Sequence, residues 1–200
     1  MQWIGLTGGI ATGKSTVSRI LVQRGHAVVD ADQLARDAVK AGTDGYREVV
    51  QAFGPDAVAP NGELDRKQIG AIVFRDKAKL ALLESIIHPR VKKLAQTKRE
   101  ELALEGRKLA FYDVPLLFEK QMKPLFDHVV VVACPPEAQL ERLKKRDGLS
   151  EDEAKRRIAS QIPIGEKVAS ADAVIRNDGS LADLEKAVSD FLLRISPSPN

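Results

Sequence analysis

The sequence contains little of what membrane proteins, disulfide-linked secreted proteins and many nucleic-acid-binding proteins require. Cys134 is the only cysteine among 200 residues, so no disulfide can form within the chain. No apolar run approaches the roughly 18 residues of a membrane-spanning helix. The start of the chain lacks the basic and long apolar segments of a signal peptide. We therefore expect a cytoplasmic protein, not attached to a membrane, in which Cys134 is buried and unreactive.

Aromatic residues are also scarce, at 4% of the chain, and this leaves few platforms for stacking on bases. No zinc, basic-zipper or RNA-recognition pattern is present. The charges nearly balance, with 31 basic and 28 acidic residues and a pI near 9.0. An excess this small argues against nucleic acid as a partner and favours small anions such as phosphates. The hydrophobic content of 44% is typical of one globular domain with subdomains.

Strands and helices alternate at the start of the chain. The apolar run from Gln2 to Leu6 indicates a strand, and Thr16 to Val22 shows helical periodicity after a glycine-containing loop. A second expected strand, Ala27 to Asp30, precedes a helix over Gln33 to Lys40. This alternation is typical of βαβ units, which build parallel sheets.

The rest of the chain adds a helical block and then further strands. From about Thr43 to Arg107 the pattern is mostly helical, and Pro89 is expected to interrupt a long helix there. The later elements are expected in this order: strands at Leu109 to Asp113 and Asp127 to Cys134, a helix at Pro136 to Lys145, a second helix capped by Ser150 and running to about Ile162, a strand at Ala173 to Ile175, a helix at Leu181 to Ile195, and a frayed end at Ser196 to Asn200.

One motif points to nucleotide binding. The run Gly8-Gly9-Ile10-Ala11-Thr12-Gly13-Lys14-Ser15 matches the P-loop pattern of glycine, four residues and then Gly-Lys-Ser. Backbone N–H groups of such a loop surround the β-phosphate of ATP, and Lys14 reaches the β- and γ-phosphate oxygens. Ser15 would bind Mg²⁺, and Thr16 would lie nearer the α-phosphate. A chance glycine-rich turn is the alternative, but the expected strand before the motif and helix after it favour the P-loop.

The P-loop is shared by many classes of protein, and several of them can be set aside. A GTPase would carry Asn-Lys-x-Asp, which is absent, and usually Asp-x-x-Gly where Asp113 is followed by Val-Pro-Leu. A chain of 200 residues also leaves no room for an ABC signature region or a second motor lobe. A small-molecule kinase remains. We divide its single domain into a core (about 1–32, 108–135 and 165–200), a helical substrate lobe (about 33–107) and a lid (about 136–164).

Two aspartates follow the second expected strand. Because ligands bind beyond the carboxyl ends of parallel strands, Asp30 and Asp32 would face the phosphate site. Phosphoryl transfer to a hydroxyl needs an acceptor for the departing proton, and we assign this role of general base to Asp32. Either aspartate could instead cap the helix that follows.

Further candidate residues lie at the third strand, in the lid and in the helical block. Asp113 ends the third strand, where P-loop enzymes commonly place a carboxylate that orders the waters around Mg²⁺, and the alternative is a capping or turn role. Arg142 and Arg146 share a helix face, so both could neutralise charge on the transferred phosphoryl group. The alternative for them, as for the neighbouring Arg156-Arg157 pair, is a solvated basic face. His88 either contacts substrate or supports a kink at Pro89.

The motifs occur in an order that resembles the dephospho-CoA kinase family. They are Ile4-Gly5-Leu6-Thr7-Gly8-Gly9-Ile10 running into Gly13-Lys14-Ser15-Thr16, Val29-Asp30-Ala31-Asp32, Ile87-His88-Pro89, Asp113-Val114-Pro115-Leu116-Leu117-Phe118-Glu119, Arg142 to Asp147, Arg157 to Gln161, and Ala171-Asp172 to Asn177. The resemblance spans nearly the whole chain. It implies transfer of the ATP γ-phosphate to the ribose 3′-hydroxyl of dephospho-CoA, the last step of coenzyme A synthesis. It also implies a three-layer P-loop NTPase fold with a five-stranded parallel sheet, an inserted helical substrate lobe and a helical lid.

The resemblance and the chemistry of the motifs together assign roles to individual residues. ATP would be bound by Gly9, Ala11, Thr12, Gly13, Lys14, Ser15, Thr16 and Asn177, with Asn177 beside the adenine. Asp32, Lys14, Arg142 and Arg146 would be catalytic; Asp32, His88 and Asp113 would contact substrate; and Ser15, with Asp113 through water, would hold Mg²⁺. Where this chain has Ala11-Thr12 the family often has Gly-Ser, which leaves both pattern glycines intact.

ATP, Mg²⁺ and dephospho-CoA are therefore the expected ligands, and we expect a monomer, without a nucleic-acid or membrane partner. No spacing of His, Cys or carboxylate residues resembles a protein metal cage, so Mg²⁺ held with the nucleotide is the only metal we predict. Two alternatives remain open. One is another small-molecule or nucleoside monophosphate kinase of the same architecture, and the other is a regulatory module that binds a nucleotide without turnover.

Overall fold

A computed structural model describes residues 1–195 of the chain, and the frayed end expected at Ser196 to Asn200 lies outside these described residues. The chain divides into two compact units. One consists of residues 1–29 together with the chain from residue 102 onward, and the other consists of residues 30–101. Each unit has a hydrophobic core of its own. The roles that we gave to core, substrate lobe and lid stay predictions.

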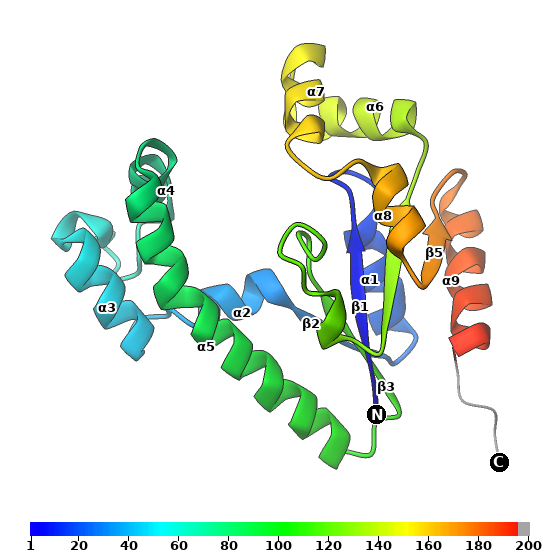
Figure 1. The fold of residues 1–200 in the computed structure, drawn as a ribbon, viewed down its shortest axis with the longest axis horizontal. Helices are drawn as coiled ribbons and strands as arrows, with labels where there is room; N and C mark the ends of the chain where they lie inside the picture. Colours follow the sequence, from blue (N-terminus) through cyan, green and yellow to red (C-terminus); the bar gives the residue numbers. More distant parts are fainter. Residues whose placement is uncertain (196–200) are drawn as a thin grey trace. The chain divides into compact units, whose positions relative to one another are not determined.

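Five strands form a sheet in the order β2-β3-β1-β4-β5 (Figure 1). Their bounds are β1 Gln2–Gly8, β2 Ala27–Asp30, β3 Leu109–Asp113, β4 His128–Ala133 and β5 Ala173–Arg176. β1 is central and pairs in parallel with β3 on one side and β4 on the other. The strand order reverses at β1, so the loop that follows it lies at the usual ligand site of an open parallel sheet. The predicted α/β fold with a five-stranded parallel sheet is confirmed.

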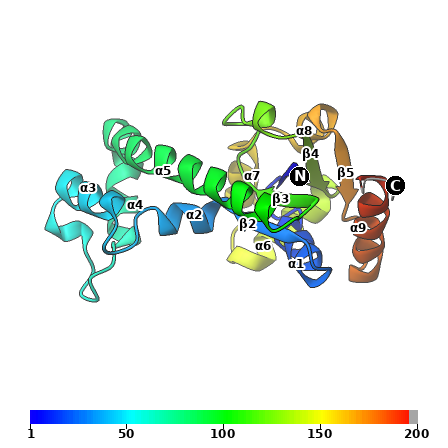
Figure 2. The ribbon, with the colours of Figure 1, turned by 90° about the horizontal axis from the view of Figure 1, so that it is seen from below.

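Helices cover this sheet on both sides. Their bounds in the first unit are α1 Lys14–Gln23, α6 Pro136–Asp147, α7 Glu151–Ala159, α8 Ile164–Ser170 and α9 Leu181–Ile195, with a short 3-10 helix at Lys123–Leu125. Figure 1 shows α6 and α7 side by side beyond the carboxyl ends of β1 and β4, and Figure 2 shows α9 next to the edge strand β5. Within residues 1–195 no helix combines the length and the apolar character needed to cross a membrane.

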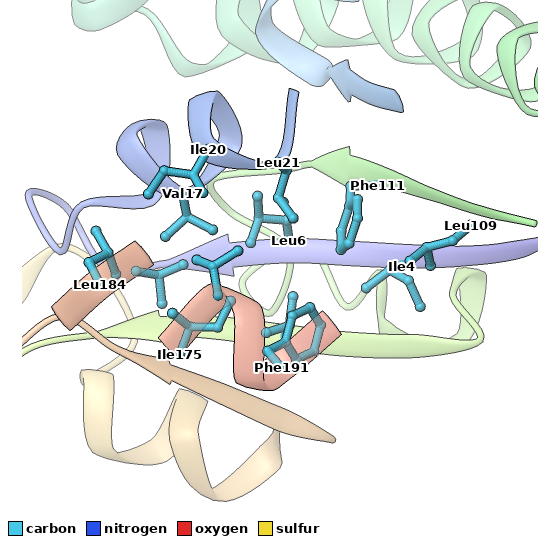
Figure 3. Close-up of a cluster of buried hydrophobic side chains, with 13 residues drawn as sticks. Ile4, Leu6, Val17, Ile20, Leu21, Leu109, Phe111, Ile175, Leu184 and Phe191 are labelled. Carbon is cyan, nitrogen blue, oxygen red and sulfur yellow. The ribbon is translucent and has the colours of Figure 1, made fainter. Parts of the chain in front are cut away.

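The main hydrophobic core lies between the sheet and the pair of helices α1 and α9 (Figure 3). Side chains of a strand alternate between its two faces, so every second residue of each strand enters this layer. The strands contribute Ile4, Leu6, Leu109, Phe111, Val130, Val132 and Ile175, and the helices contribute Val17, Ile20, Leu21, Leu184, Val188 and Phe191. The intervening valines of β4 are buried as well, as predicted for a strand covered on both faces.

The opposite face of the sheet packs against the segment that follows β3. A Cβ atom at Gly5 would come within 2.7 Å of Leu117 and 3.0 Å of Phe126, so only glycine lets these side chains approach the sheet. Trp3 and Tyr112 stack beside them with their ring centres 5.5 Å apart. The chain after Asp113 is therefore held against β1, the strand that leads into the P-loop.

The second unit, residues 30–101, is helical. Its elements are α2 Ala31–Asp37, α3 Asp44–Phe53, a 3-10 helix at Pro55–Ala57, α4 Arg66–Arg75, and most of α5, which spans Lys77–Leu104. Its core consists of Val39, Val49, Ala57, Ile69 and Ile86. Thr43 and Asp65 cap α3 and α4 by accepting hydrogen bonds from backbone N–H groups of the first helical turn.

Two expectations about helices are wrong. Pro89 does not interrupt α5, which continues from Lys77 to Leu104. Proline at this position removes one helical hydrogen bond, the one to the carbonyl of Ser85, and the 28-residue helix keeps the hydrogen bonds of its other turns. The helix expected to reach Ile162 ends at Ala159, and an unpredicted helix, α8, begins directly after Pro163. Proline can precede a helix as well as end one, and we considered only the second role.

Candidate active site

The P-loop connects the central strand β1 to helix α1. Gly13 has φ of 100° and ψ of 14° and forms the N-cap of α1, a left-handed conformation that favours glycine. Ala11 also has a positive φ, of 58°. The buried Thr12 closes the turn because its Oγ1 donates to the carbonyl of Gly9 at 2.9 Å. The sequence therefore forms the strand, loop and helix that the motif requires.

Three amide side chains from distant segments hold this loop. Asn177, which follows β5, donates its Nδ2 to the carbonyl of Thr12 at 2.9 Å. Gln139 of α6 donates its Nε2 to the carbonyl of Ile10 at 2.8 Å. Gln161, which follows α7, accepts the N–H of Ile10 at 2.8 Å through its Oε1. Both backbone polar groups of Ile10 are thus bound by side chains, so the shape of the loop is fixed before any ligand enters.

Lys14 and Asp113 meet at the carboxyl ends of two neighbouring strands. Lys14 Nζ forms an ion pair with Asp113 Oδ1, and the Asp113 side chain is only 7% exposed. Ser18 Oγ donates to the other carboxylate oxygen, Oδ2, at 2.6 Å. The parallel pairing of β1 with β3 sets Leu6 opposite Asp113, which brings Asp113 to the base of the P-loop. The structure thus brings together two of the predicted site residues.

The two arginines of α6 that we predicted to belong to a lid have different partners. Arg142 is half-buried and donates Nη2 to the carbonyl of Asn177 at 3.1 Å, while its Nη1 is buried and has no hydrogen-bond partner in the described part of the chain. Arg146 is exposed and forms an ion pair with Asp147 at 2.7 Å, and Asp147 also pairs with Arg157 at 3.0 Å. Bonding to Arg146 and Arg157 lowers the pKa of the Asp147 carboxyl.

Cys134 lies beside Arg142, directly after β4. The thiol is buried, as we expected. Burial raises its pKa, and the guanidinium of Arg142 opposes that rise only in part. A thiol in such surroundings is a poor nucleophile, because the reactive species is the thiolate.

Asp30 and Asp32 both belong to the helical unit, at the start of α2. Asp30 is the N-cap: its Oδ1 accepts the N–H of Asp32 at 2.7 Å and the N–H of Gln33 at 3.1 Å. The alternative in which Asp32 caps this helix is therefore wrong, because Asp30 is the N-cap. Asp32 lies in the first turn of α2 and is exposed, so its carboxylate is accessible to a ligand.

His88 lies in the same helical unit, on α5. Its side chain is 57% exposed, and Nε2 lies 3.8 Å from Glu84 Oε1 one turn earlier in the helix. Lys14, Asp113, Asn177, Arg142 and Arg146 all belong to the other unit. The roles of Asp32 and His88 toward substrate therefore remain predictions.

Sequence reasoning missed several residues that shape the site. Ser18 was missed although it lies one helical turn after Lys14, a spacing at which side chains share a face. Gln139 and Gln161 were missed because nothing in the local pattern shows that they reach Ile10. The same holds for Lys167, which is fully buried and forms an ion pair with Glu119 at 2.7 Å. Glu119 lay within the motif that we quoted, but it received no role.

Comparison with known proteins extends the resemblance found in the sequence. A family model described as dephospho-CoA kinase matches residues 2–183. A dephospho-CoA kinase of Anaeromyxobacter dehalogenans is 50% identical over 180 residues, which covers 90% of this chain and 85% of that protein. One of Bdellovibrio bacteriovorus is 50% identical over 192 residues and covers 96% of this chain and 95% of its own length.

Solved structures agree with this result. A dephospho-CoA kinase from Campylobacter jejuni has a TM-score of 0.75 and 31% identity, and the match covers 97% of this chain and 96% of that one. A Thermus thermophilus protein has a TM-score of 0.82 and 38% identity, with 98% of each chain covered. A shikimate kinase from Bacteroides thetaiotaomicron, at 14% identity and a TM-score of 0.51, shares the fold.

The resemblance that the motifs indicated is therefore confirmed, as is the prediction of a phosphotransferase with a P-loop. The match covers the P-loop, the segment after β3, helices α6 and α7 and β5, so all the elements that form the site in the first unit are included. The chain belongs to the dephospho-CoA kinase family.

Proposed function

We propose that the chain transfers the γ-phosphoryl group of ATP to the ribose 3′-hydroxyl of dephospho-CoA, with the P-loop as ATP site and Asp32 as general base. The observation that carries this proposal is the P-loop lysine, Lys14, held at the carboxyl edge of the sheet by Asp113. Membership of the dephospho-CoA kinase family supports the identity of the acceptor.

ATP would be bound by the backbone of residues 9–16 and by Lys14. The first N–H groups of a helix have no partner within it, and in α1 the hydrogen bonds to the N-cap begin only with Thr16, which favours a phosphate at this position. The Lys14 side chain is 19% exposed, so its ammonium group can exchange part of its contact with Asp113 for phosphate oxygens. Asp113 and Ser18 would keep the lysine aligned with the loop while the phosphate is bound.

The residues present fit Mg²⁺, which prefers oxygen ligands and keeps several waters. Ser15 offers an exposed hydroxyl at the start of α1. Both oxygens of Asp113 are already engaged by Lys14 and Ser18, so this carboxylate suits contact through water better than direct ligation. The ion, when bound, would neutralise negative charge on the β- and γ-phosphates.

Asp32 would accept the proton of the ribose hydroxyl. Asp30 caps α2, so the Asp32 carboxylate is not used as the N-cap of this helix. Asp32 is also exposed in the first turn, where its oxygens can approach a hydroxyl group. A positioned base of this kind typically accelerates transfer about 10²-fold to 10⁴-fold.

The remaining residues would bind and orient the two nucleotides. Arg146 can exchange its exposed partner Asp147 for a phosphate, because a guanidinium group binds carboxylates and phosphates alike. Arg142, which donates to the carbonyl of Asn177, would neutralise charge on the transferred phosphoryl group together with Arg146. Asn177 would lie beside the adenine, and Thr16 would lie near the α-phosphate. His88, exposed on α5, would contact dephospho-CoA.

We further propose that the enzyme acts as a monomer in the cytoplasm, without a nucleic-acid partner. Both nucleotides are small anions, in keeping with the modest net charge of +3. Light scattering during size exclusion tests the oligomeric state, with a mass near 21.9 kDa expected for a monomer. A mass of twice that value would contradict the monomer.

A panel of acceptors tests the function. Purified protein receives ATP and Mg²⁺ with dephospho-CoA, AMP, CMP, shikimate or gluconate, and release of ADP is followed. We expect turnover with dephospho-CoA and a product that carries phosphate on the 3′ position, which ³¹P NMR identifies. Turnover with another acceptor and none with dephospho-CoA would refute the proposal. ATP binding without turnover on any acceptor would favour the regulatory module.

A further inference from the structure

A lysine with no access to solvent lies behind the P-loop. Lys167, on the short helix α8, is 0% exposed. Its ammonium group forms an ion pair with Glu119 Oε1 at 2.7 Å. The same nitrogen donates to the carbonyl of Gly8 at 3.5 Å, at the end of β1 where the P-loop begins. Lys167 therefore touches the backbone of the loop from the side away from solvent.

Glu119 binds a second segment in addition to Lys167. Its Oε1 also accepts the N–H of Ile162 at 3.1 Å, in the connection between α7 and α8. Burial raises the pKa of this carboxyl, but hydrogen bonds from Lys167 and from backbone N–H groups, together with the lysine charge, lower it further than burial raises it. The net shift is downward, so Glu119 is ionised at neutral pH and the contact with Lys167 is a true ion pair.

The residue before Ile162 is Gln161, which accepts the N–H of Ile10 at 2.8 Å. One carboxylate thus supports two contacts with the P-loop: Lys167 at Gly8 and, through the backbone of Ile162, Gln161 at Ile10. These two contacts stand on either side of Gly9. A Cβ atom at Gly8 would lie 2.7 Å from both Thr12 Oγ1 and the carbonyl oxygen of Val132, so a residue with a side chain does not fit at this end of β1.

A contribution to folding stability does not by itself explain why a buried ion pair such as Lys167–Glu119 is present. Removing two charges from water is costly, and apolar residues of similar volume often replace a buried ion pair without loss of stability. Position, in contrast, matters greatly in a phosphate site, where a displacement of about 1 Å can cost about 100-fold in rate. The Lys167 ammonium group, which is bound to Glu119, can hold the carbonyl of Gly8 in one place through its second contact. An apolar side chain would only fill the space.

We propose that Lys167 and Gln161, both held by Glu119, are positioning residues for the phosphate-binding loop. Neither residue is assigned a contact with ATP. They act through the backbone of Gly8 and Ile10, and so determine where the N–H groups of the loop point. This inference rests on the proposed binding of ATP in that loop.

Nucleotide affinity in the absence of acceptor is the direct test. We would measure the Kd of ATP by calorimetry for the wild-type protein, Lys167→Met and Gln161→Leu, and then the KM values for ATP and for dephospho-CoA. We expect ATP affinity to fall about 10-fold or more for Lys167→Met and about threefold to 10-fold for Gln161→Leu. The KM for dephospho-CoA should change less than about twofold, a selectivity that a general loss of structure would not produce.

Lys155→Met is the matched control. Lys155 is an exposed lysine of α7 that pairs with Glu151 at 2.6 Å and has no contact with the loop, so its loss should leave both KM values unchanged. The thermal unfolding of each variant is measured as well, to show that it is folded. If Lys167→Met does not fold, Gln161→Leu still decides the question, because that half-exposed side chain can be replaced without disturbing the buried pair.

The outcomes separate the two proposals. Folded variants that bind ATP as tightly as the wild-type protein would overturn the positioning role and leave the proposed function intact. A parallel rise in both KM values would also overturn it, because the effect would then not be specific to the nucleotide loop. Wild-type protein without measurable affinity for ATP would refute the proposed function, and the positioning role with it.

Discussion

The side-chain amide of Asn177 occupies the space that a side chain at Gly13 would need. Asn177 lies in the turn after β5, and its Nδ2 donates to the carbonyl of Thr12 at 2.9 Å. Gly13 in turn has a φ of 100°, which favours glycine even where space is open. The last strand of the sheet thus sets the geometry of a loop that begins at residue 8.

Gly13→Ala should therefore damage the nucleotide site. The added Cβ would both overlap the Asn177 amide and occupy the left-handed region, and backbone strain of this kind costs about 1–3 kcal/mol. We expect ATP affinity to fall at least about 10-fold, with a lower free energy of unfolding in urea.

Gly25→Ala is the matched control for this substitution. Gly25 has a φ of 82° but nothing within 4 Å of its Cβ position, so only the backbone cost remains. ATP affinity should then match that of the wild-type protein. Equal losses of ATP affinity in both variants would show that general destabilisation, and not the contact between Gly13 and Asn177, lowers the affinity.

Lys14→Ala should abolish most of the activity while the protein stays folded. The substitution removes the charge that contacts the transferring phosphate, and loss of one such electrostatic contact commonly lowers kcat by about 10²-fold to 10³-fold. Asp113 keeps its hydrogen bond from Ser18, so cooperative unfolding should persist in calorimetry. A folded variant with wild-type kcat would exclude Lys14 from the phosphate site.

Local signals in the sequence were enough to predict much of the fold. The helix from Leu181 to Ile195 was predicted with its observed bounds, because its apolar residues repeat at helical spacing. The capping box at Ser150 also marked the start of α7 correctly, since both of its hydrogen bonds are between residues three apart. The P-loop was found because its spacing is specific and both flanking elements were visible.

The supports of the P-loop could not be predicted in the same way. Gln161 contacts Ile10 across a long stretch of chain, and only the folded sheet brings the two together. Lys167 would ordinarily be placed on the surface, because lysine is almost never fully buried unless it is paired, and its partner Glu119 lies in another segment. Pro89 misled us for a different reason, since a proline removes only one hydrogen bond of a helix and does not always end it.

Stability should fall as pH drops below neutrality, in part because of His26. Burial lowers the pKa of this imidazole, and the charges of Arg24 and Arg107 lower it further. His26 packs edge-on against Phe111 with ring centres 5.9 Å apart. In the unfolded chain its pKa returns to about 6.5. The unfolded state therefore binds the proton more readily than the folded state does. The stability that neutral His26 contributes is fully present above the unfolded-state pKa, and it is lost as pH falls through the lower pKa of the folded state.

The melting temperature between about pH 8 and pH 5 measures this effect. Wild-type protein should lose more stability over this range than His26→Gln, which carries no titrating group at this position. Identical slopes in the two proteins would show that His26 does not contribute. Work at constant ionic strength keeps screening of Arg24 and Arg107 the same throughout.

Asp32→Asn tests the proposed general base, in single-turnover reactions with saturating ATP, Mg²⁺ and dephospho-CoA. Asp30→Asn is the control, because asparagine is as good an N-cap as aspartate and should preserve α2. We expect Asp32→Asn to slow phosphoryl transfer by about 10²-fold or more with ATP affinity unchanged, and Asp30→Asn to transfer at nearly the wild-type rate. A wild-type rate of transfer in Asp32→Asn would exclude Asp32 as the general base.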